Sequence, residues 1–332
     1  MKAPKVHGVD LGYGLLLMIV MALGNAVSQL LPEIGHLKDQ YNLFYDGSVA
    51  ALLFFNGFLM SKKVFFKLDG PIVNAVRKQA LVLIGLGLLL NLFGHPCTPV
   101  LLIGMCMGAG SLIARLNTQF LAFSLVIFVM ISLSMVIGQN MGKNENSNIL
   151  IELFTNALYK GYYGFVLWYP IYAFGMIASR IPITTHRVPS LVIGSFLVAL
   201  GLFIDYRYQL SLTIDSVDPM VLLKPSQSIF YPGFVFFGAG IGLMYSGIFV
   251  PIKITPMLST IGCVGSMRYS VLMFISIIQI LSMVVWPKLT LQQVIIFNTA
   301  IWTLLIPLSM IWKQHFSIGP VENVLRYIFR DT

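Results

Sequence analysis

Long apolar runs, bounded by charged or turn-forming residues, follow one another along almost the whole chain. A helix needs about 20 apolar residues to cross a membrane. The pattern predicts ten spans, at residues 11–31, 48–60, 79–93, 98–114, 119–138, 165–178, 191–204, 231–250, 270–286 and 294–311.

The second and third runs are shorter than the usual minimum of about 17 residues for a span. We expect these two helices to be kinked or to extend into the flanking residues 64–66 and 77–78. If neither run crossed the membrane, the chain would have eight spans, and this is the main alternative.

The composition supports a membrane protein. Of the 332 residues 57% are hydrophobic and 10% charged, with a mean hydropathy of +0.85. Soluble domains carry about 25% charged residues. The composition therefore excludes soluble enzyme folds, disordered tails and disulfide scaffolds, and predicts an all-α, polytopic bundle integral to a membrane, with the bacterial cytoplasmic membrane as the expected location.

The net charge of +9 is explained by an excess of basic residues on the cytoplasmic side of the membrane, so we expect no nucleic-acid partner. With ten spans and a cytoplasmic N-terminus, fifteen of the 21 Lys and Arg residues are cytoplasmic and six are not. The six are Lys38, Lys143, Lys160, Arg207, Lys224 and Lys288. This topology places both termini in the cytoplasm.

The first run also resembles a signal peptide, because Lys2 and Lys5 precede it and it ends in the small-residue sequence of residues 22–24. Asp10 interrupts its start and many spans follow it. We therefore favour an uncleaved first span.

The last residues form a separate unit in this prediction. Residues 1–318 make one transmembrane domain, and residues 319–332 make a cytoplasmic amphipathic helix that lies on the membrane surface. Gly319-Pro320 can open that helix, and Glu322 in its first turn suits the helix dipole. Its apolar face is formed by Val321, Val324, Leu325, Ile328 and Phe329.

Polar groups are scarce inside the predicted spans. Ion-coupled carriers usually need ionisable residues at depth, and the near absence of such residues argues against a carrier. The spans contain five amide side chains, and each needs a hydrogen-bond partner on a neighbouring helix. These amides are Asn25, Asn56, Asn91, Gln279 and Asn298. The glycines of residues 238–242 and the Gly104/Gly108 spacing predict close helix packing.

The loop between the first two spans collects the most reactive side chains. They are Glu33, His36, Lys38, Asp39, Tyr41, Tyr45 and Asp46. A histidine can exchange a proton near neutral pH, and a carboxylate can orient it. The alternative is a solvated loop histidine without a catalytic role. We predict no metal site.

Several short motifs resemble the transmembrane acyltransferases similar to heparan-alpha-glucosaminide N-acetyltransferase and the bacterial YeiB-like proteins. Residues 9–14 resemble the Asp-x-x-Arg-Gly opening of that family, with Tyr13 where the family has Arg. Residues 46–58 resemble its second span, an Asp followed by a Phe-rich stretch and Gly.

Later motifs follow in the same order. Residues 77–86 resemble the basic entry to the third span, residues 161–180 the central span, and residues 261–270 the loop before a late span. Residues 312–322, with Gly319-Pro320-Val321-Glu322, resemble the Gly-Pro-Leu-Glu signature that closes the YeiB-like members.

The resemblance implies acyl transfer from cytosolic acyl-CoA, with acetyl-CoA as the expected donor, to a hydroxyl or amine on the other side. The acceptor is expected to be an envelope glycan or a lipid-linked sugar. By the same resemblance His36 is the general base, and Asn25 orients the acceptor or stabilises the oxyanion. We add Asp46 as a possible orienter of His36.

The phosphates of CoA would need a cationic surface on the inner face, which basic residues there could form. They are Lys62, Lys63, Lys67, Arg77 and Lys78. The alternative function is a non-catalytic module of the same architecture, acting in export, in immunity or as a partner subunit. Besides the lipid bilayer and the acceptor, a homo-oligomeric partner is possible.

Overall fold

The computed structural model describes residues 7–30, 38–67, 70–92, 99–138, 158, 164–181, 186–214, 231–253, 255–285, 290–316 and 319–328. Within these ranges all regular structure is helical, which confirms the all-α class. The helices are α1 (Gly8–Leu30), α2 (Lys38–Lys67), α3 (Gly70–Leu92), α4 (Pro99–Ile113), α5 (Thr118–Gly138), α7 (Phe165–Ala178), α8 (Arg187–Ile214), α9 (Tyr231–Phe249), α10 (Pro256–Ser266), α11 (Arg268–Val285), α12 (Leu291–His315) and α13 (Pro320–Ile328).

Each of the ten apolar runs corresponds to a helix. The two short runs extend into the expected flanking residues, since α2 includes residues 64–66 and α3 includes residues 77–78. Both helices are longer still, with 30 residues in α2 and 23 in α3. Because α2 begins at Lys38, the prediction of a loop over residues 38–46 is wrong. At a rise of about 1.5 Å per residue, both helices are long enough for a membrane span.

Three stretches in the described part of the chain are long and apolar enough to cross a membrane. They are Leu43–Ser61 in α2, Arg187–Tyr206 in α8 and a segment that begins in α12, Gln292–Val324. The bent pair Leu258–Ser266 and Arg268–Ile278 makes a fourth if the pair is one span. These helices support a membrane protein.

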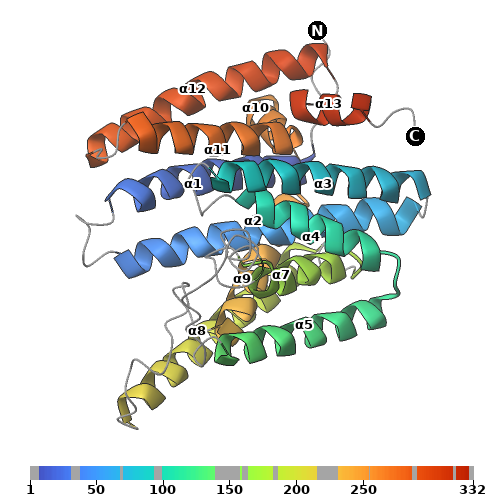
Figure 1. The fold of residues 1–332 in the computed structure, drawn as a ribbon, viewed down its shortest axis with the longest axis vertical. Coiled ribbons are helices and arrows are strands. Elements are labelled where there is room, and N and C mark those ends of the chain that lie inside the picture. Colours follow the sequence, from blue (N-terminus) through green and yellow to red (C-terminus); the bar gives the residue numbers. More distant parts are fainter. Residues whose placement is uncertain are drawn as a thin grey trace.

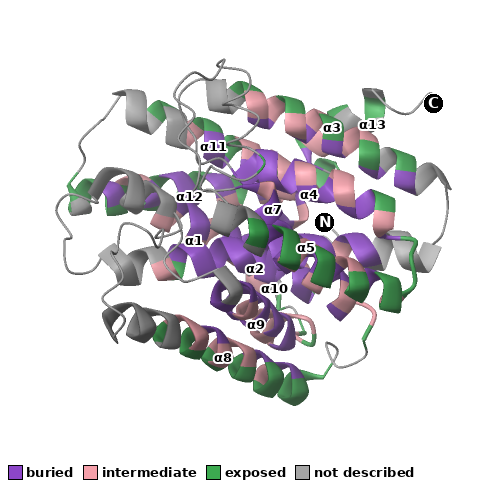
Figure 2. Ribbon diagram, turned by 60° about the horizontal axis from the view of Figure 1, so that its bottom comes forward, coloured by how far each residue is buried: buried purple, intermediate pink, exposed green. Residues whose placement is uncertain are grey.

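Helix α2 lies at the centre of the bundle. It contacts α1, α4, α7 and α9, and these neighbours bury most of its length (Figure 1). Helices α5 and α8 lie at the edge of the bundle and expose one face each (Figure 2). The exposed faces carry large apolar side chains such as Phe123 and Phe196, as expected of surfaces in contact with lipid.

Glycines allow several helix pairs to approach at backbone distance. A Cβ on Gly57 of α2 would collide with the carbonyl oxygen of Tyr172, and one on Gly175 of α7 with that of Phe54. Between α8 and α9, a Cβ on Gly240 would lie 2.6 Å from the carbonyl oxygen of Gly194. The close packing predicted for residues 238–242 is therefore confirmed.

A side chain from α5 compensates for the proline inside α7. Pro170 has no N–H, so the carbonyl of Val166 lacks its helical hydrogen bond. The hydroxyl of Ser132 lies 2.7 Å from that oxygen and 2.6 Å from the Phe128 carbonyl oxygen of its own helix, so its one hydrogen is shared between the two acceptors. This contact satisfies a buried carbonyl and joins α5 to α7.

The segment before α11 is a helix, and the prediction of a loop at residues 261–270 is wrong. Thr255 caps α10 by accepting a hydrogen bond from the Leu258 N–H, and Pro256 follows at the first helical position. Met267 then leaves the helical conformation, and α10 and α11 meet at 83°. Gly265 allows α10 to pack tightly against α1, because a Cβ there would collide with the carbonyl oxygen of Asp10.

Candidate functional site

A cluster of polar side chains lies at the break between α10 and α11. We call it the Arg268 cluster, and it consists of Tyr13, Asn56, Arg268, Tyr269 and Glu322. Four helices contribute to it, namely α1, α2, α11 and α13. The cluster is at the same end of the bundle as the first turns of α1 and the short helix α13 (Figure 1).

Close packing of α1 against α10 brings the cluster together. A Cβ on Gly14 would lie 2.5 Å from the carbonyl oxygen of Ile261 and 3.1 Å from the Gly265 nitrogen. A Cβ on Gly265 would collide with the carbonyl oxygen of Asp10. Only glycine fits at these two positions, and the contact sets α1 directly against the start of α11.

Arg268 is the first residue of α11, and its guanidinium lies between two tyrosine rings. Its Cζ atom is 5.6 Å from the centre of the Tyr13 ring and 5.7 Å from that of Tyr269. Both distances are within the range of a cation–π interaction. The acidic groups that interact electrostatically with Arg268 are Asp10 and Glu322.

Tyr13 is completely buried and is held from α2. The Asn56 side-chain nitrogen donates to the Tyr13 hydroxyl oxygen at 2.8 Å and to the Leu52 carbonyl at 2.9 Å. This confirms, for Asn56, the predicted hydrogen bond of a span amide to a neighbouring helix. The ring of Tyr13 is therefore fixed against the guanidinium.

Glu322 of α13 caps α11, a different helix from its own. Its carboxylate accepts hydrogen bonds from the Tyr269 N–H at 2.8 Å, from the Ser270 N–H at 3.3 Å and from the Ser270 hydroxyl. The Ser270 oxygen accepts in turn from the Val321 N–H at 2.9 Å. The carboxylate thus satisfies backbone donors that a helix N-terminus leaves unpaired.

The cluster holds one partly buried guanidinium, with the carboxylates of Glu322 and Asp10 close enough to interact with it electrostatically. A partly buried guanidinium interacts more strongly with an anion or a carbonyl oxygen than an exposed one does. Tyr13, Tyr269 and Asn56 hold the surrounding surface rigid. The guanidinium can donate hydrogen bonds to an oxygen atom of a ligand that reaches it.

Of the predicted catalytic residues, Asn25 lies in the C-terminal part of α1 and Asp46 in the N-terminal part of α2. Asn25 is a helical residue of α1 whose side chain lies outside the described residues, as does all of His36. Asp46 is fully buried in α2. Ten residues, or about 15 Å along the helix, separate Asp46 from Asn56. Asp46 is therefore not part of the Arg268 cluster.

The predicted CoA-binding residues flank the turn between α2 and α3. Lys62, Lys63 and Lys67 occupy the last turns of α2, and their side chains are outside the described residues. On α3, Arg77 is exposed and Lys78 is half-buried.

Arg180, in the turn after α7, forms a hydrogen bond to the C-terminal part of α2. It donates to the Ser61 hydroxyl at 3.1 Å, to the Leu116 carbonyl at 2.6 Å and to the Ala114 carbonyl at 2.7 Å. Partial burial lowers the pKa of Arg180 from its ordinary value. The guanidinium joins α2, the α4–α5 turn and α7, and we regard it as a structural group.

Sequence reasoning missed the Arg268 cluster. From the sequence, Arg268 is interpreted as a cytoplasmic charge, and Glu322 as a dipole partner of its own helix and as part of the closing Gly-Pro-Val-Glu motif. The apolar, glycine-containing run at residues 256–266 was the available signal, since it is long enough for a short helix ending beside Arg268. Comparisons with models of known families, with curated protein sequences and with solved structures found no match.

Proposed function

We propose that this chain is a membrane-embedded acyltransferase of the bacterial cytoplasmic membrane, with ten spans and both termini in the cytoplasm. It moves an acetyl or similar acyl group from cytosolic acyl-CoA to a hydroxyl or amine of an envelope glycan or a lipid-linked sugar. The proposal includes membership of the acyltransferase superfamily that the sequence resembles.

The observation that carries the proposal is the guanidinium of Arg268 beside Tyr13. Tyr13 stands at the position where the resembled family has Arg, and Arg268 brings a cation to the same point from α11, 5.6 Å from the ring centre. A residue from another helix therefore compensates for the departure of Tyr13 from the family pattern. In the proposed topology this cation faces the cytoplasmic half of the bundle, where the acyl donor arrives.

In this function the two ends of α1 have different tasks. At the cytoplasmic end, Arg268 binds an anionic or carbonyl oxygen of the donor, and the basic residues around the α2–α3 turn attract its phosphates. At the other end, His36 removes a proton from the acceptor while Asn25 stabilises the oxyanion. Asp46, buried in α2 ten residues before Asn56, orients His36.

The experiment is transfer from radiolabelled acetyl-CoA in proteoliposomes supplied with extracted envelope acceptors. Arg268→Gln keeps a polar side chain but removes the cation, and we expect acetyl-CoA binding and transfer to fall at least tenfold. Arg187→Gln is the matched control, because Arg187 is an exposed arginine at the start of α8. His36→Ala and Asn25→Ala should abolish transfer without weakening donor binding. Full transfer by Arg268→Gln would disprove the assigned role of Arg268.

The second candidate is a non-catalytic membrane module acting in export, in immunity or as a partner subunit. The observation that favours it is the tight packing between α2 and α7, where Gly57 and Gly175 bring the two backbones into contact. The α11 N-terminus beside Arg268 is already occupied by Glu322. Absence of both transfer and CoA release with every donor and acceptor tested would favour this candidate.

A further inference from the structure

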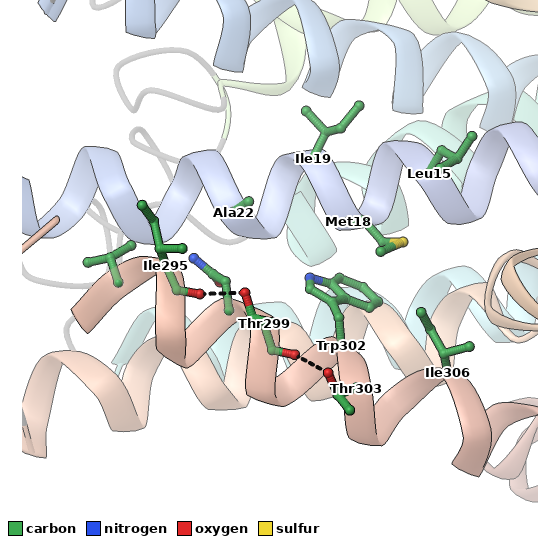
Figure 3. Close-up of a pocket in the computed structure, with 11 residues that line it drawn as sticks. Leu15, Met18, Ile19, Ala22, Ile295, Thr299, Trp302, Thr303 and Ile306 are labelled. Atoms are coloured by element: carbon green, nitrogen blue, oxygen red, sulfur yellow. Dashed lines mark hydrogen bonds between the residues drawn. The ribbon is translucent and has the colours of Figure 1, made fainter. Parts of the chain in front are cut away.

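A groove lies between α1 and α12, away from the Arg268 cluster. Its volume is about 620 Å³, within the range of about 300–1,000 Å³ that is usual for small-molecule sites. The α1 side is lined by Leu15, Met18, Ile19 and Ala22 (Figure 3). The α12 side is lined by Val294, Ile295, Asn298, Thr299, Trp302, Thr303 and Ile306.

The groove opens sideways from the bundle. Ile295 is 56% exposed, and Thr299 and Thr303 are exposed on the same helix. Further apolar residues on the outer face of α12, such as Leu304 and Leu308, are also exposed. In the membrane this face meets lipid, so the groove is accessible to molecules dissolved in the bilayer.

One buried donor in the groove lacks a partner. Trp302 is 7% exposed, and its indole Nε1–H has no hydrogen-bond acceptor among the described residues. Figure 3 shows the Trp302 ring projecting from α12 towards α1, into the groove. A buried N–H without an acceptor is unfavourable by about 1–3 kcal/mol, so the site is suited to a ligand that carries an acceptor oxygen.

The neighbouring hydroxyl groups complete a polar stripe in an otherwise apolar groove. Thr299 donates to the Ile295 carbonyl at 2.8 Å, and Thr303 to the Thr299 carbonyl at 2.7 Å (Figure 3). Their hydrogens are used within α12, but their oxygens can still accept. The groove therefore matches an amphiphile, with a long apolar part and a few polar atoms on one side.

The direction of the groove connects it with the proposed acceptor site. Asn25 lies seven residues after Met18 on α1, two helical turns further along the same face. In the proposed topology that direction leads to the extracytoplasmic side. A ligand oxygen bound to Trp302 would lie near the level of Met18, about 10 Å before Asn25 along α1. The head group would then extend from there along α1 towards the end where the acceptor is modified.

We infer that the groove binds the single apolar chain of a lipid-linked acceptor, with an oxygen near its head group accepting a hydrogen bond from Trp302 Nε1. This inference rests on the proposed function for the role of the ligand as acceptor. It specifies the acceptor as lipid-linked rather than as a free glycan. The binding itself is measurable without any transfer activity.

The test uses the full chain in phosphatidylcholine nanodiscs and a diazirine analogue of farnesyl phosphate, mapped after photolysis by mass spectrometry. We expect cross-links on α1 and α12 at residues that line the groove, and competition by undecaprenyl phosphate. Trp302→Phe keeps the ring but removes the N–H, and it should weaken binding about tenfold. Ala22→Phe should fill the groove and abolish the cross-links.

Leu304→Phe is the matched control, since Leu304 is 64% exposed on the outer face of α12 and does not line the groove. Unchanged binding by both Trp302→Phe and Ala22→Phe would overturn the inference. Equal displacement of the probe by phosphatidylglycerol would also overturn it, because the groove would then hold ordinary membrane lipid. Binding with the expected variant pattern but without acetyl transfer would support the lipid site and count against the proposed transferase.

Discussion

The carboxylate of Glu322 accepts a hydrogen bond from the backbone N–H of Tyr269 at 2.8 Å, and so the last helix of the chain caps α11. The two residues are 53 positions apart. Their contact fixes α13 beside Arg268. It gives the Glu in the closing Gly-Pro-Val-Glu motif a structural task that its own helix does not explain.

Removal of this cap should destabilise the contact between α11 and α13. We expect Glu322→Ala to reduce the free energy of unfolding by about 1–2 kcal/mol, the usual value of a helix N-cap. α13 should also become more sensitive to limited proteolysis. Asn323→Ala is the control, because Asn323 is an exposed neighbour on the same helix. Equal effects of the two variants would argue against the cap.

Ser132 should contribute to stability, because Pro170 leaves the Val166 carbonyl without its helical hydrogen bond. Ser132→Ala leaves the Val166 carbonyl without a donor in an apolar environment, and we expect a loss of about 1–2 kcal/mol in the free energy of unfolding. Ser134→Ala should have almost no effect, since Ser134 is exposed and bonds only within α5. Replacing Pro170 by Ala restores the helical N–H, so the cost of Ser132→Ala should be smaller in that background.

The glycine contact between α2 and α7 makes a clear prediction about packing. Gly57→Ala places a methyl group against the Tyr172 carbonyl, and we expect a destabilisation of about 1–3 kcal/mol, measured by denaturation in mixed micelles. Gly85→Ala in α3 is the matched control, with no atom within 4 Å of the added Cβ. Because alanine favours helix, Gly85→Ala should be neutral or stabilising by up to about 1 kcal/mol. A Gly57→Ala variant as stable as the parent protein would contradict the close approach.

Labelling with a membrane-impermeant maleimide can distinguish ten spans from eight. In a Cys97→Ser background, single cysteines replace exposed residues, and intact cells are labelled from outside. With ten spans Asn74→Cys is cytoplasmic and should be protected, whereas with eight spans it is outside and should react. Gln292→Cys should react and Arg115→Cys should be protected under both topologies, so they serve as the controls.

The helical architecture could be predicted from the sequence in detail. All ten apolar runs lie in helices, although α2 and α3 extend well beyond the flanking residues that the sequence indicated. The reason is that helices in an apolar environment satisfy their own backbone hydrogen bonds, so length and hydropathy predict them without knowledge of their neighbours. The tail helix was also visible, through Gly319-Pro320 and the spacing of its apolar residues.

The candidate site was less predictable, because its residues come from distant parts of the chain. Tyr13 and Asn56 are 43 positions apart, and Arg268 is still further from both. No local pattern indicates that α10 turns away from α11 at 83°, or that the carboxylate of α13 lies at the break. The predicted catalytic pair of Asn25 and His36 stays a prediction, since their side chains are outside the described residues.

The sequence by itself determined the class of the protein, the positions of the helices that contain its ten apolar runs and the asymmetry of its charges, because each of these depends on composition and local order along the chain. Only the tertiary structure decided which cation lies beside Tyr13, which carboxylate caps α11 and where an unpaired indole N–H faces an open groove. Those relationships depend on how helices approach one another, and the approach is set by contacts between residues such as Gly14 and Gly265 that are far apart in the sequence.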